Sequence, residues 1–200
     1  MKPISTSCER NRAPILQVLR EHFAGRRRVL EIGSGTGQHA VYFAAAMPHL
    51  TWQASDLEDN LSGIRAWLEE ADLPNTPAPL ALDVTRSPWP AVAADAIFTA
   101  NTLHIMGWDA VEAFFRGAGA ALADVREGVL VVYGPFNYGG AYTSDSNRDF
   151  DAWLQARDPR SGIRDLEAVD ALAAAAGLRR VADVGMPANN RCLVWRAKEW

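Results

Sequence analysis

Three glycines at alternate positions follow an apolar segment near the start of the chain. Gly33, Gly35 and Gly37 come directly after the run Val29–Ile32, in which Glu31 is the one charged side chain. Glycine permits backbone conformations that a Cβ atom obstructs, and it lets the main chain approach a ligand closely. The pattern therefore predicts a strand, a tight turn and a helix that together bind a cofactor.

Two cofactors suit such a turn. The segment Gly35–Ala40 satisfies the GxGxxA fingerprint of dinucleotide-binding folds, with Asp56 at roughly the distance expected for a ribose ligand. However, a carboxylate at Glu31 would oppose a pyrophosphate at the start of the helix, where amide donors are wanted. S-adenosyl-L-methionine carries an ammonium and a sulfonium and no phosphate. We therefore expect S-adenosyl-L-methionine, and NAD(P) is the alternative.

Acidic side chains follow the next two predicted strands. In doubly wound sheets the ligand lies beyond the carboxyl ends of the strands. Asp56 can accept two hydrogen bonds from a ribose diol, and Asp83 can accept from an exocyclic amine while Val84 packs on a purine. A lone aspartate in a loop is more commonly a helix cap or a turn former, so only the joint placement of these residues favours a site.

Methyl transfer from a sulfonium mainly requires that the acceptor be positioned. A base near the acceptor would help to remove its proton, and His104, just after the fourth predicted strand, is the best-placed imidazole, with a pKa expected near working pH. A polar residue that packs beside the next helix is the alternative interpretation of His104. Tyr133 is either an orienting hydroxyl or a core aromatic residue with its hydroxyl in water.

Three irregular segments are expected to contact the acceptor. Residues 134–147 are rich in glycine and predict a flap, residues 186–191 predict the turn of a hairpin, and residues 8–12 predict part of a lid. Each also has a simpler interpretation, as a connector, an asparagine turn or a solvated helix start. The candidate acceptor-binding residues are Arg10, Asn11, Phe136, Asn137, Tyr142, Ser146, Asn189 and Asn190.

Hydrophobic periodicity predicts alternating strands and helices, and hence a three-layer doubly wound α/β domain with a mostly parallel sheet and an antiparallel edge hairpin. We expect one domain over residues 1–200, with residues 1–25 as an N-terminal helical lid. The predicted helices are 9–23, 38–47, 57–71, 110–123, 146–158 and 166–176; the predicted strands are 29–32, 50–54, 80–82, 94–99, 128–133, 180–184 and 191–196.

The composition is that of an ordinary globular domain, with 48% hydrophobic residues, 22% charged residues and a net charge of −4. The arginines are dispersed among acids, so a nucleic-acid partner is not expected. No stretch approaches the roughly eighteen apolar residues that a membrane span needs, so a membrane partner is not expected either. Cys8 and Cys192 lie far apart, and the histidines lack metal-ligand spacing, so we expect no metal and a reduced, cytoplasmic setting. Oligomeric state stays open.

Glu31–Gly37 resembles motif I of the class I S-adenosylmethionine-dependent methyltransferases. Nearly the whole chain resembles the DUF938 family, also called methyltransferase-like 26, through six segments at residues 7–11, 101–105, 133–136, 144–147, 162–165 and 186–190. The resemblance implies a seven-stranded methyltransferase fold in which Glu31 and the glycines hold the methionyl end, Asp56 the ribose and Asp83 the adenine. It also implies that residues 101–103 line the methionine side.

The predicted function is an S-adenosylmethionine-dependent methyltransferase acting on a small molecule, with transfer to oxygen, nitrogen or sulfur unresolved. An NAD(P)-dependent oxidoreductase and a non-catalytic S-adenosylmethionine-binding regulatory protein are the alternatives. Strand four does not end in the Asn/Asp-Pro-Pro-Tyr/Phe motif of many enzymes that methylate nucleic acids and proteins. The full set of candidate cofactor-binding residues is Glu31, Gly33, Ser34, Gly35, Gly37, Asp56, Leu57, Asp83, Val84, Asn101, Thr102 and Leu103.

Overall fold

The computed structural model of the chain describes residues 2–198 and divides into two compact units, one up to Ala100 and one from Asn101 onward. The main sheet has seven strands in the order β3-β2-β1-β4-β5-β9-β8. This strand number agrees with the sequence-based prediction. The first unit contains α1 (Thr6–His22), β1 (Arg28–Ile32), α2 (Gln38–Ala46), β2 (Thr51–Asp56), the short helix η1 (Glu58–Asn60), α3 (Leu61–Ala71), β3 (Leu80–Ala81) and β4 (Ala96–Ala100).

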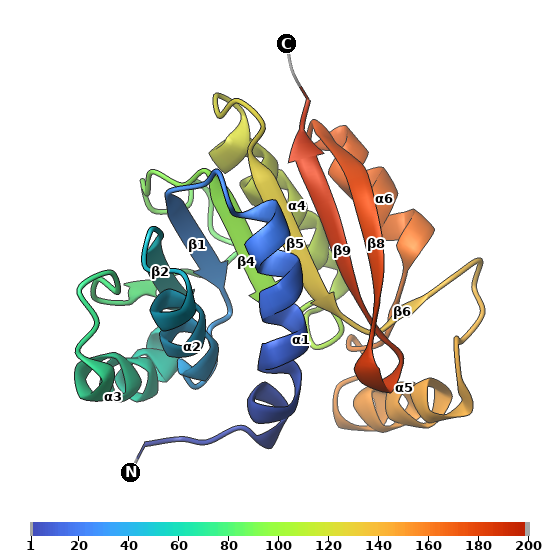
Figure 1. The fold of residues 1–200 in the computed structure, drawn as a ribbon. Helices are drawn as coiled ribbons and strands as arrows, with labels where there is room; N and C mark the ends of the chain where they lie inside the picture. Colours follow the sequence, from blue (N-terminus) through green and yellow to red (C-terminus); the bar gives the residue numbers. More distant parts are fainter. Residues whose placement is uncertain (1, 199–200) are drawn as a thin grey trace. The chain divides into compact units, whose positions relative to one another are not determined.

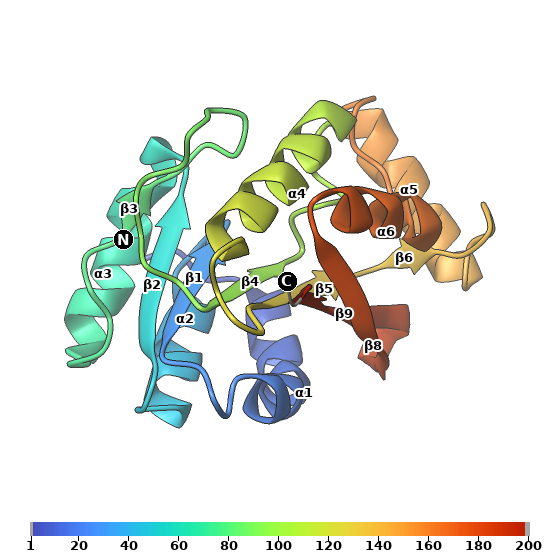
Figure 2. The same ribbon diagram turned by 90° about the horizontal axis from the view of Figure 1, so that it is seen from above.

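All four strands of the first unit are parallel. Strand β1 lies between β2 and β4, and β3 adds to the outer edge of β2. Helices α1, α2 and α3 lie in sequence along these strands, with α2 in contact with both of its neighbours (Figures 1 and 2). Beneath them, the fully buried rings of Phe43, Trp52 and Phe98 contact one another at centroid distances of 5.4 to 5.9 Å. This aromatic cluster packs α2, which carries Phe43, against β2, which carries Trp52, and β4, which carries Phe98.

The second unit is built around an antiparallel hairpin. It contains α4 (Trp108–Leu122), β5 (Val129–Gly134), β6 (Phe136–Asn137), α5 (Asp145–Arg157), β7 (Arg164–Asp165), α6 (Leu166–Ala175), β8 (Leu178–Met186), the short helix η2 (Pro187–Asn189) and β9 (Asn190–Ala197). Strand β9 is antiparallel to both β5 and β8, so the predicted edge hairpin is confirmed. The side chains of β5 are buried along its whole length, as expected for a covered strand.

Two sequence-based predictions about elements were wrong. The helix expected from Leu57 begins with the 3-10 turn Glu58–Asn60, and α3 starts only at Leu61. The cause is Asp56, whose Oδ1 accepts hydrogen bonds from the amide of Leu57 and from Nδ2 of Asn60. Residues 134–147, expected to be irregular, include β6, which pairs in parallel with β7 as a separate two-stranded sheet.

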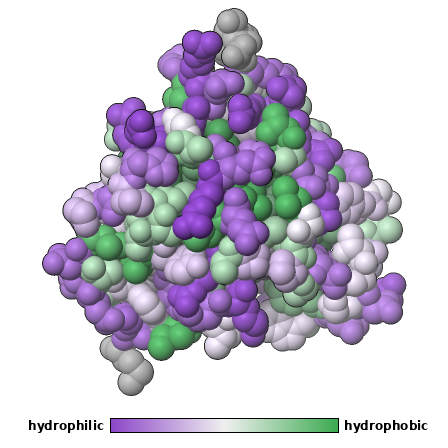
Figure 3. Space-filling view, in the orientation of Figure 1, coloured by the Kyte–Doolittle hydropathy of each residue, from purple (hydrophilic) through white to green (hydrophobic). Residues whose placement is uncertain are grey.

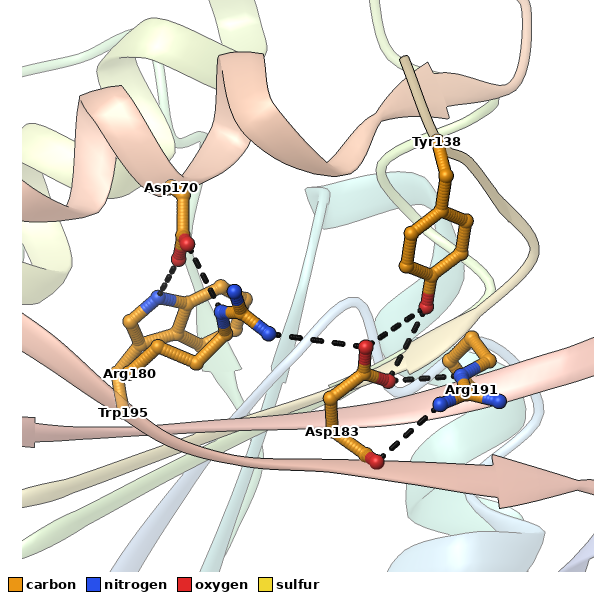
Figure 4. Close-up of polar contacts among 6 residues, drawn as sticks. All are labelled: Tyr138, Asp170, Arg180, Asp183, Arg191 and Trp195. Carbon is orange, nitrogen blue, oxygen red and sulfur yellow. Dashed lines mark hydrogen bonds and ion pairs between the residues drawn. The ribbon is translucent and has the colours of Figure 1, made fainter. Parts of the chain in front are cut away.

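A polar network joins the hairpin to the neighbouring elements of the second unit (Figure 4). Asp183 on β8 accepts from the Tyr138 hydroxyl at 2.9 Å and from Nε of Arg191 at 2.7 Å, and it forms an ion pair with Arg180 at 3.6 Å. Asp170 on α6 bonds both Arg180 and the indole N–H of Trp195. The network holds Tyr138, the residue that follows β6, against β8.

Hydrophilic side chains cover much of the face drawn in Figure 3 and interrupt the apolar areas there. Within residues 2–198, no helix combines the length and the apolar character that crossing a membrane requires.

Glycine is required at position 37 for two reasons. Its φ is 91°, in the region that L side chains rarely adopt, and a Cβ there would lie 3.1 Å from the Ile64 Cα and 3.2 Å from the Trp67 Cβ. Gly177 has a similar φ of 79° but open space around the corresponding position. A side chain at position 37 would therefore add both backbone strain and steric contact, whereas one at position 177 would add backbone strain alone.

We expect Gly37→Ala to lower the free energy of unfolding by about 3 kcal/mol, because strain and overpacking combine. Gly177→Ala, which adds strain alone, should cost about 1 kcal/mol. Urea unfolding of both variants checks this difference. Equal losses would show that α3 does not press on the glycine turn.

Candidate cofactor and acceptor sites

Glu31 lies beneath the glycine turn and is almost completely buried. Its side chain is 2% exposed, and its Oε2 accepts a hydrogen bond of 2.8 Å from the indole N–H of Trp52 on β2. Burial raises the pKa of Glu31 to about 7, because a charged carboxylate loses its hydration there, although hydrogen bonds from Trp52 and Ser34 oppose the shift. The carboxyl group is therefore only partly ionised at neutral pH. The expectation of a fully charged acid at this position is corrected accordingly.

The turn after β1 is linked to the end of β2 by reciprocal hydrogen bonds. The amide of Ser34 donates to the Ser55 carbonyl at 3.0 Å, and the Ser34 hydroxyl accepts from the Ser55 amide at 3.2 Å. Gly33 and Gly35 both have positive φ, 69° and 58°, so the chain reverses tightly between these links. Ser34, predicted as a cofactor ligand, is 6% exposed and its hydroxyl serves this link.

Asp56 is held by three donors from the protein. Its Oδ2 accepts from the Gly35 amide at 2.7 Å, and its Oδ1 accepts from the Leu57 amide and from Asn60. A carboxylate has about four acceptor positions, so one remains, on Oδ2. One further donor fits without a change in the protein, whereas the predicted bidentate ribose contact requires that Asn60 or Leu57 be displaced.

The other residues predicted to contact the adenine differ in exposure and in hydrogen bonding. Leu57 is 52% exposed although it is a large apolar residue, and Val84 is buried. Asp83 forms the turn that was its alternative interpretation, since its Oδ1 accepts from the Thr85 amide and hydroxyl. These bonds to Thr85 lower the pKa of Asp83, so the carboxylate is charged, and its Oδ2 forms an ion pair with Nε of Arg86 at 3.5 Å.

The start of α1 is bonded to the start of α2. Gln38, the first residue of α2, accepts from the Ser5 amide at 2.5 Å and donates to Glu9 at 2.7 Å, and the imidazole of His39 meets Oδ1 of Asn11 at 2.7 Å. Asn11, predicted to contact the acceptor, is thus 7% exposed and engaged within the protein, while Arg10 is exposed. Helix α1 is anchored directly beside the glycine turn.

In the second unit, residues 162–164 hold the loop that begins at Asn101. Arg164 donates from Nε to the Leu103 carbonyl at 3.1 Å and from Nη2 to the Met106 carbonyl. The Gly162 amide donates to the His104 carbonyl at 2.9 Å. Asn101 has a φ of 58°, which asparagine tolerates better than most residues, and its amide bonds the Tyr133 carbonyl. Thr102 and Leu103 are buried.

His104 lies against the end of β5 and is 6% exposed. A Cβ at Gly134 would lie 3.6 Å from its Nδ1, and its ring meets Phe150 edge-on at 5.4 Å. Burial, and secondarily the charge of Arg164, lowers the pKa of His104 to about 4. The expectation of a pKa near working pH was therefore wrong. His104 is neutral at pH 7, so it can accept a proton, but it is a weak base.

The predicted flap residues are bonded to α5 and to the hairpin turn. The Tyr142 hydroxyl donates to Asp151 at 2.7 Å, and Asp151 also accepts from the Ile163 amide at 2.5 Å. Asn189 donates to the Ser146 hydroxyl at 3.3 Å, and its carbonyl accepts from Asn147. The structure thus brings Ser146 and Asn189 together, as two predicted acceptor residues.

The remaining candidates have local roles. Asn190 donates to the Pro187 and Ala188 carbonyls of its own turn, which is the simpler interpretation of this residue. Phe136 and Tyr133 are buried, at 1% and 4% exposure.

Sequence reasoning missed four residues that organise these sites, namely Gln38, Trp52, Asp151 and Arg164. Gln38, Trp52 and Arg164 act through partners far away in the chain, so no local pattern marks these contacts, although Arg164 lies in a segment that resembles the family. Asp151 contacts residues 9 and 12 positions away. Among residues 2–198, no group of three or more histidine, cysteine, aspartate or glutamate side chains is arranged to hold a metal ion.

Comparison with protein families identifies the chain. The model of DUF938, described as a protein of unknown function, matches residues 2–197. The chain belongs to the DUF938 family.

Solved structures show the fold of this DUF938 protein. It is similar to an O-methyltransferase family protein from Burkholderia thailandensis, with a TM-score of 0.81 and 18% identity over 94% of this chain and 56% of that one. For the S-adenosylmethionine-dependent methyltransferase SibL in its apo form, the TM-score is 0.79, with 22% identity over 96% and 56%. PigF with SAH gives 0.78, with 16% identity over 93% and 55%.

The predicted methyltransferase fold is therefore confirmed. This DUF938 chain spans a little over half the length of these three structures.

The pKa of Glu31 predicts how stability depends on pH. Between about pH 4.5 and pH 7 the folded chain keeps a proton on Glu31 that the unfolded chain has released, so this group makes the protein less stable as pH rises. Glu31→Gln keeps an acceptor for Trp52 and cannot ionise. Its stability relative to the wild type should increase by about 2 to 3 kcal/mol from pH 5 to pH 8.

Urea unfolding at both pH values measures this change, with the exposed residue Glu70 replaced by Gln as a control. A difference between wild type and Glu31→Gln that does not vary with pH would mean that Glu31 is ionised throughout.

The low pKa of His104 predicts that its imidazole NMR signal does not shift between pH 8 and pH 5.5, because the ring stays neutral. His104→Gln identifies the signal. Arg164→Met should raise the pKa of His104, since a nearby positive charge disfavours protonation. Titration of the wild-type signal near pH 6.5 would contradict this assignment.

Proposed function

We propose that this DUF938 protein is an S-adenosylmethionine-dependent methyltransferase that acts on a small-molecule acceptor. The observation that carries the proposal is the environment of Gly35. Its backbone amide orients Asp56, its φ is 58°, and no atom lies within 4 Å of the position that a Cβ would occupy. Because Gly35 is exposed and has free space beside it, a nucleoside can approach the backbone closely here. The oriented carboxylate of Asp56 then lies beside the nucleoside.

The residues around this turn fit the chemistry of S-adenosylmethionine. Asp56 offers one free acceptor position for a ribose hydroxyl, and the exposed Leu57 offers an apolar surface for the adenine. Asp83 offers a charged carboxylate to the exocyclic amine, and its ion-pair partner, the exposed Arg86, would share Oδ2 with that amine. Glu31 is a buried acid whose pKa lies near neutrality, so a nearby cation would favour its charged form. This last feature supports a cationic methionyl end over a pyrophosphate.

When bound, the cofactor supplies an electrophilic methyl group on a sulfonium. The protein then has to hold the acceptor, exclude water and take up a proton where the acceptor loses one. Neutral His104 is the proposed proton acceptor, and its low basicity suits an acceptor atom that is already partly acidic, such as a phenol or a thiol. Asn101, Thr102 and Leu103 stay predictions for the methionine side, and Tyr133 for orientation.

Gly35→Ala tests the cofactor site. The added Cβ would occupy the open space and strain the turn, so we expect the dissociation constant for S-adenosylmethionine to rise at least tenfold, as measured by calorimetry. Gly177→Ala, which adds a side chain at another glycine of positive φ just after α6, is the matched control and should bind like the wild type. Binding of NAD in place of S-adenosylmethionine would contradict the proposal.

Turnover is tested with a metabolite extract and S-adenosylmethionine labelled in its methyl group. We expect one or a few small molecules to become labelled, and His104→Gln to slow their formation by about 10²-fold. Tight cofactor binding without a labelled product would instead favour a regulatory binding protein.

A further inference from the structure

One buried polar atom of the second unit has no partner. Asn137 on β6 is 8% exposed, and its Oδ1 is the single buried side-chain nitrogen or oxygen within residues 2–198 that makes no hydrogen bond. An unsatisfied buried acceptor of this kind costs about 1–3 kcal/mol. Such a group in a folded protein requires an explanation, and a ligand that supplies the missing donor is one.

A second acceptor lies beside it. In the parallel pairing of β6 with β7, Asn137 is directly opposite Asp165. Neighbouring strands are about 4.8 Å apart and opposed residues point to the same face, so the two side chains are adjacent. Asp165 is half-buried and occupies the N-cap position of α6, yet its carboxylate caps no amide of that helix. No donor in the described part of the chain bonds this carboxylate.

Arg164 does not neutralise Asp165, although it is its neighbour in sequence. Successive residues of a strand point to opposite faces, and the guanidinium of Arg164 is used on the carbonyls of Leu103, Met106 and Arg160. The pair Asn137 and Asp165 thus presents acceptors and one negative charge. The complementary ligand group has several N–H donors and a positive charge, which describes an alkylammonium.

We propose that Asn137 and Asp165 form a binding site for an alkylammonium group. This inference rests on the proposed function: the methyl acceptor carries an alkylammonium group, and this site recognises that group.

The turn that adjoins Asn137 is held by few hydrogen bonds. Gly139 and Gly140 follow Tyr138 with φ values of 56° and 74°, and no atom lies within 4 Å of either Cβ position. The turn is held by two backbone bonds between Tyr138 and Ala141 and by a bond from the Gly139 amide to Glu167. Few contacts therefore oppose its displacement, while the bonds of Tyr138 to Asp183 keep the end of β6 in place (Figure 4).

Ethylammonium chloride is the probe, titrated into the full chain without S-adenosylmethionine and followed by amide NMR shifts. We expect saturable shifts at residues 136–142 and 164–166, and none with ethanol, which has similar size and no charge. Asp165→Asn should raise the dissociation constant at least tenfold and Asn137→Leu at least fivefold. Asp145→Asn, which removes an exposed acid of α5, should leave it unchanged.

Asn137→Leu has a second readout. If Oδ1 lacks a partner, replacing the amide with an apolar group of similar size does not lower the melting temperature, whereas loss of a structural hydrogen bond would. If Asn137→Leu fails to fold, Oδ1 has a structural partner and the inference is overturned.

The site is refuted if ethylammonium and ethanol shift the same amides equally, or if Asp165→Asn binds ethylammonium like the wild type. Because the titration uses no cofactor, either result leaves the proposed methyltransferase function standing. Conversely, failure to bind S-adenosylmethionine would end the proposed function and leave the ammonium site intact.

Discussion

The burial of Glu31 against Trp52 is the interaction on which the first unit depends. A carboxyl group at the end of a buried strand is costly unless it is protonated or hydrogen-bonded, and the indole N–H from β2 supplies a bond at 2.8 Å. The same residue, Trp52, belongs to the aromatic cluster beneath α2. Glu31, the pair of strands β1 and β2, and helix α2 are therefore positioned together. A disturbance of any one changes the charge state of Glu31.

The glycine turn also fixes the position of Asp56. Bonds between Ser34 and Ser55 align the ends of β1 and β2, and the amide of Gly35 then meets Asp56. Gln38 and Asn11 attach α1 to the start of α2, so the N-terminal helix stabilises the helix that begins at the turn. A preorganised polar arrangement of this kind reduces the ordering that a ligand would otherwise require.

In the second unit, polar groups are also preorganised, here by hydrogen bonds to the backbone of the loop that carries His104. Four successive carbonyls, from Leu103 to Met106, accept hydrogen bonds from residues 161–164. The loop that carries His104 is thus fixed through its backbone, and the buried imidazole is left neutral. Asp151 extends this organisation to Tyr142.

Most elements could be predicted from the sequence because hydrophobic periodicity and glycine or proline boundaries are local signals. The helix beginning at Gln38 and the edge hairpin were found in this way. The start of α3 could not, since Asp56 competes for the amide of Leu57 through a side-chain bond that spacing does not reveal. The pKa of His104 was missed for a similar reason, because burial and the proximity of Arg164 arise only in the folded unit. That residues 1–200 form one domain stays a prediction.

If the glycine turn binds a positively charged adenosyl sulfonium, binding must depend on the charge of Glu31. Calorimetric titration with S-adenosylmethionine and with S-adenosylhomocysteine, whose sulfur is uncharged, each at pH 6 and pH 8, measures this dependence. We expect S-adenosylmethionine to bind more tightly at pH 8, as Glu31 ionises, and S-adenosylhomocysteine to gain less from the same change. Absence of S-adenosylmethionine binding, or equal pH dependence for both compounds, would contradict this expectation.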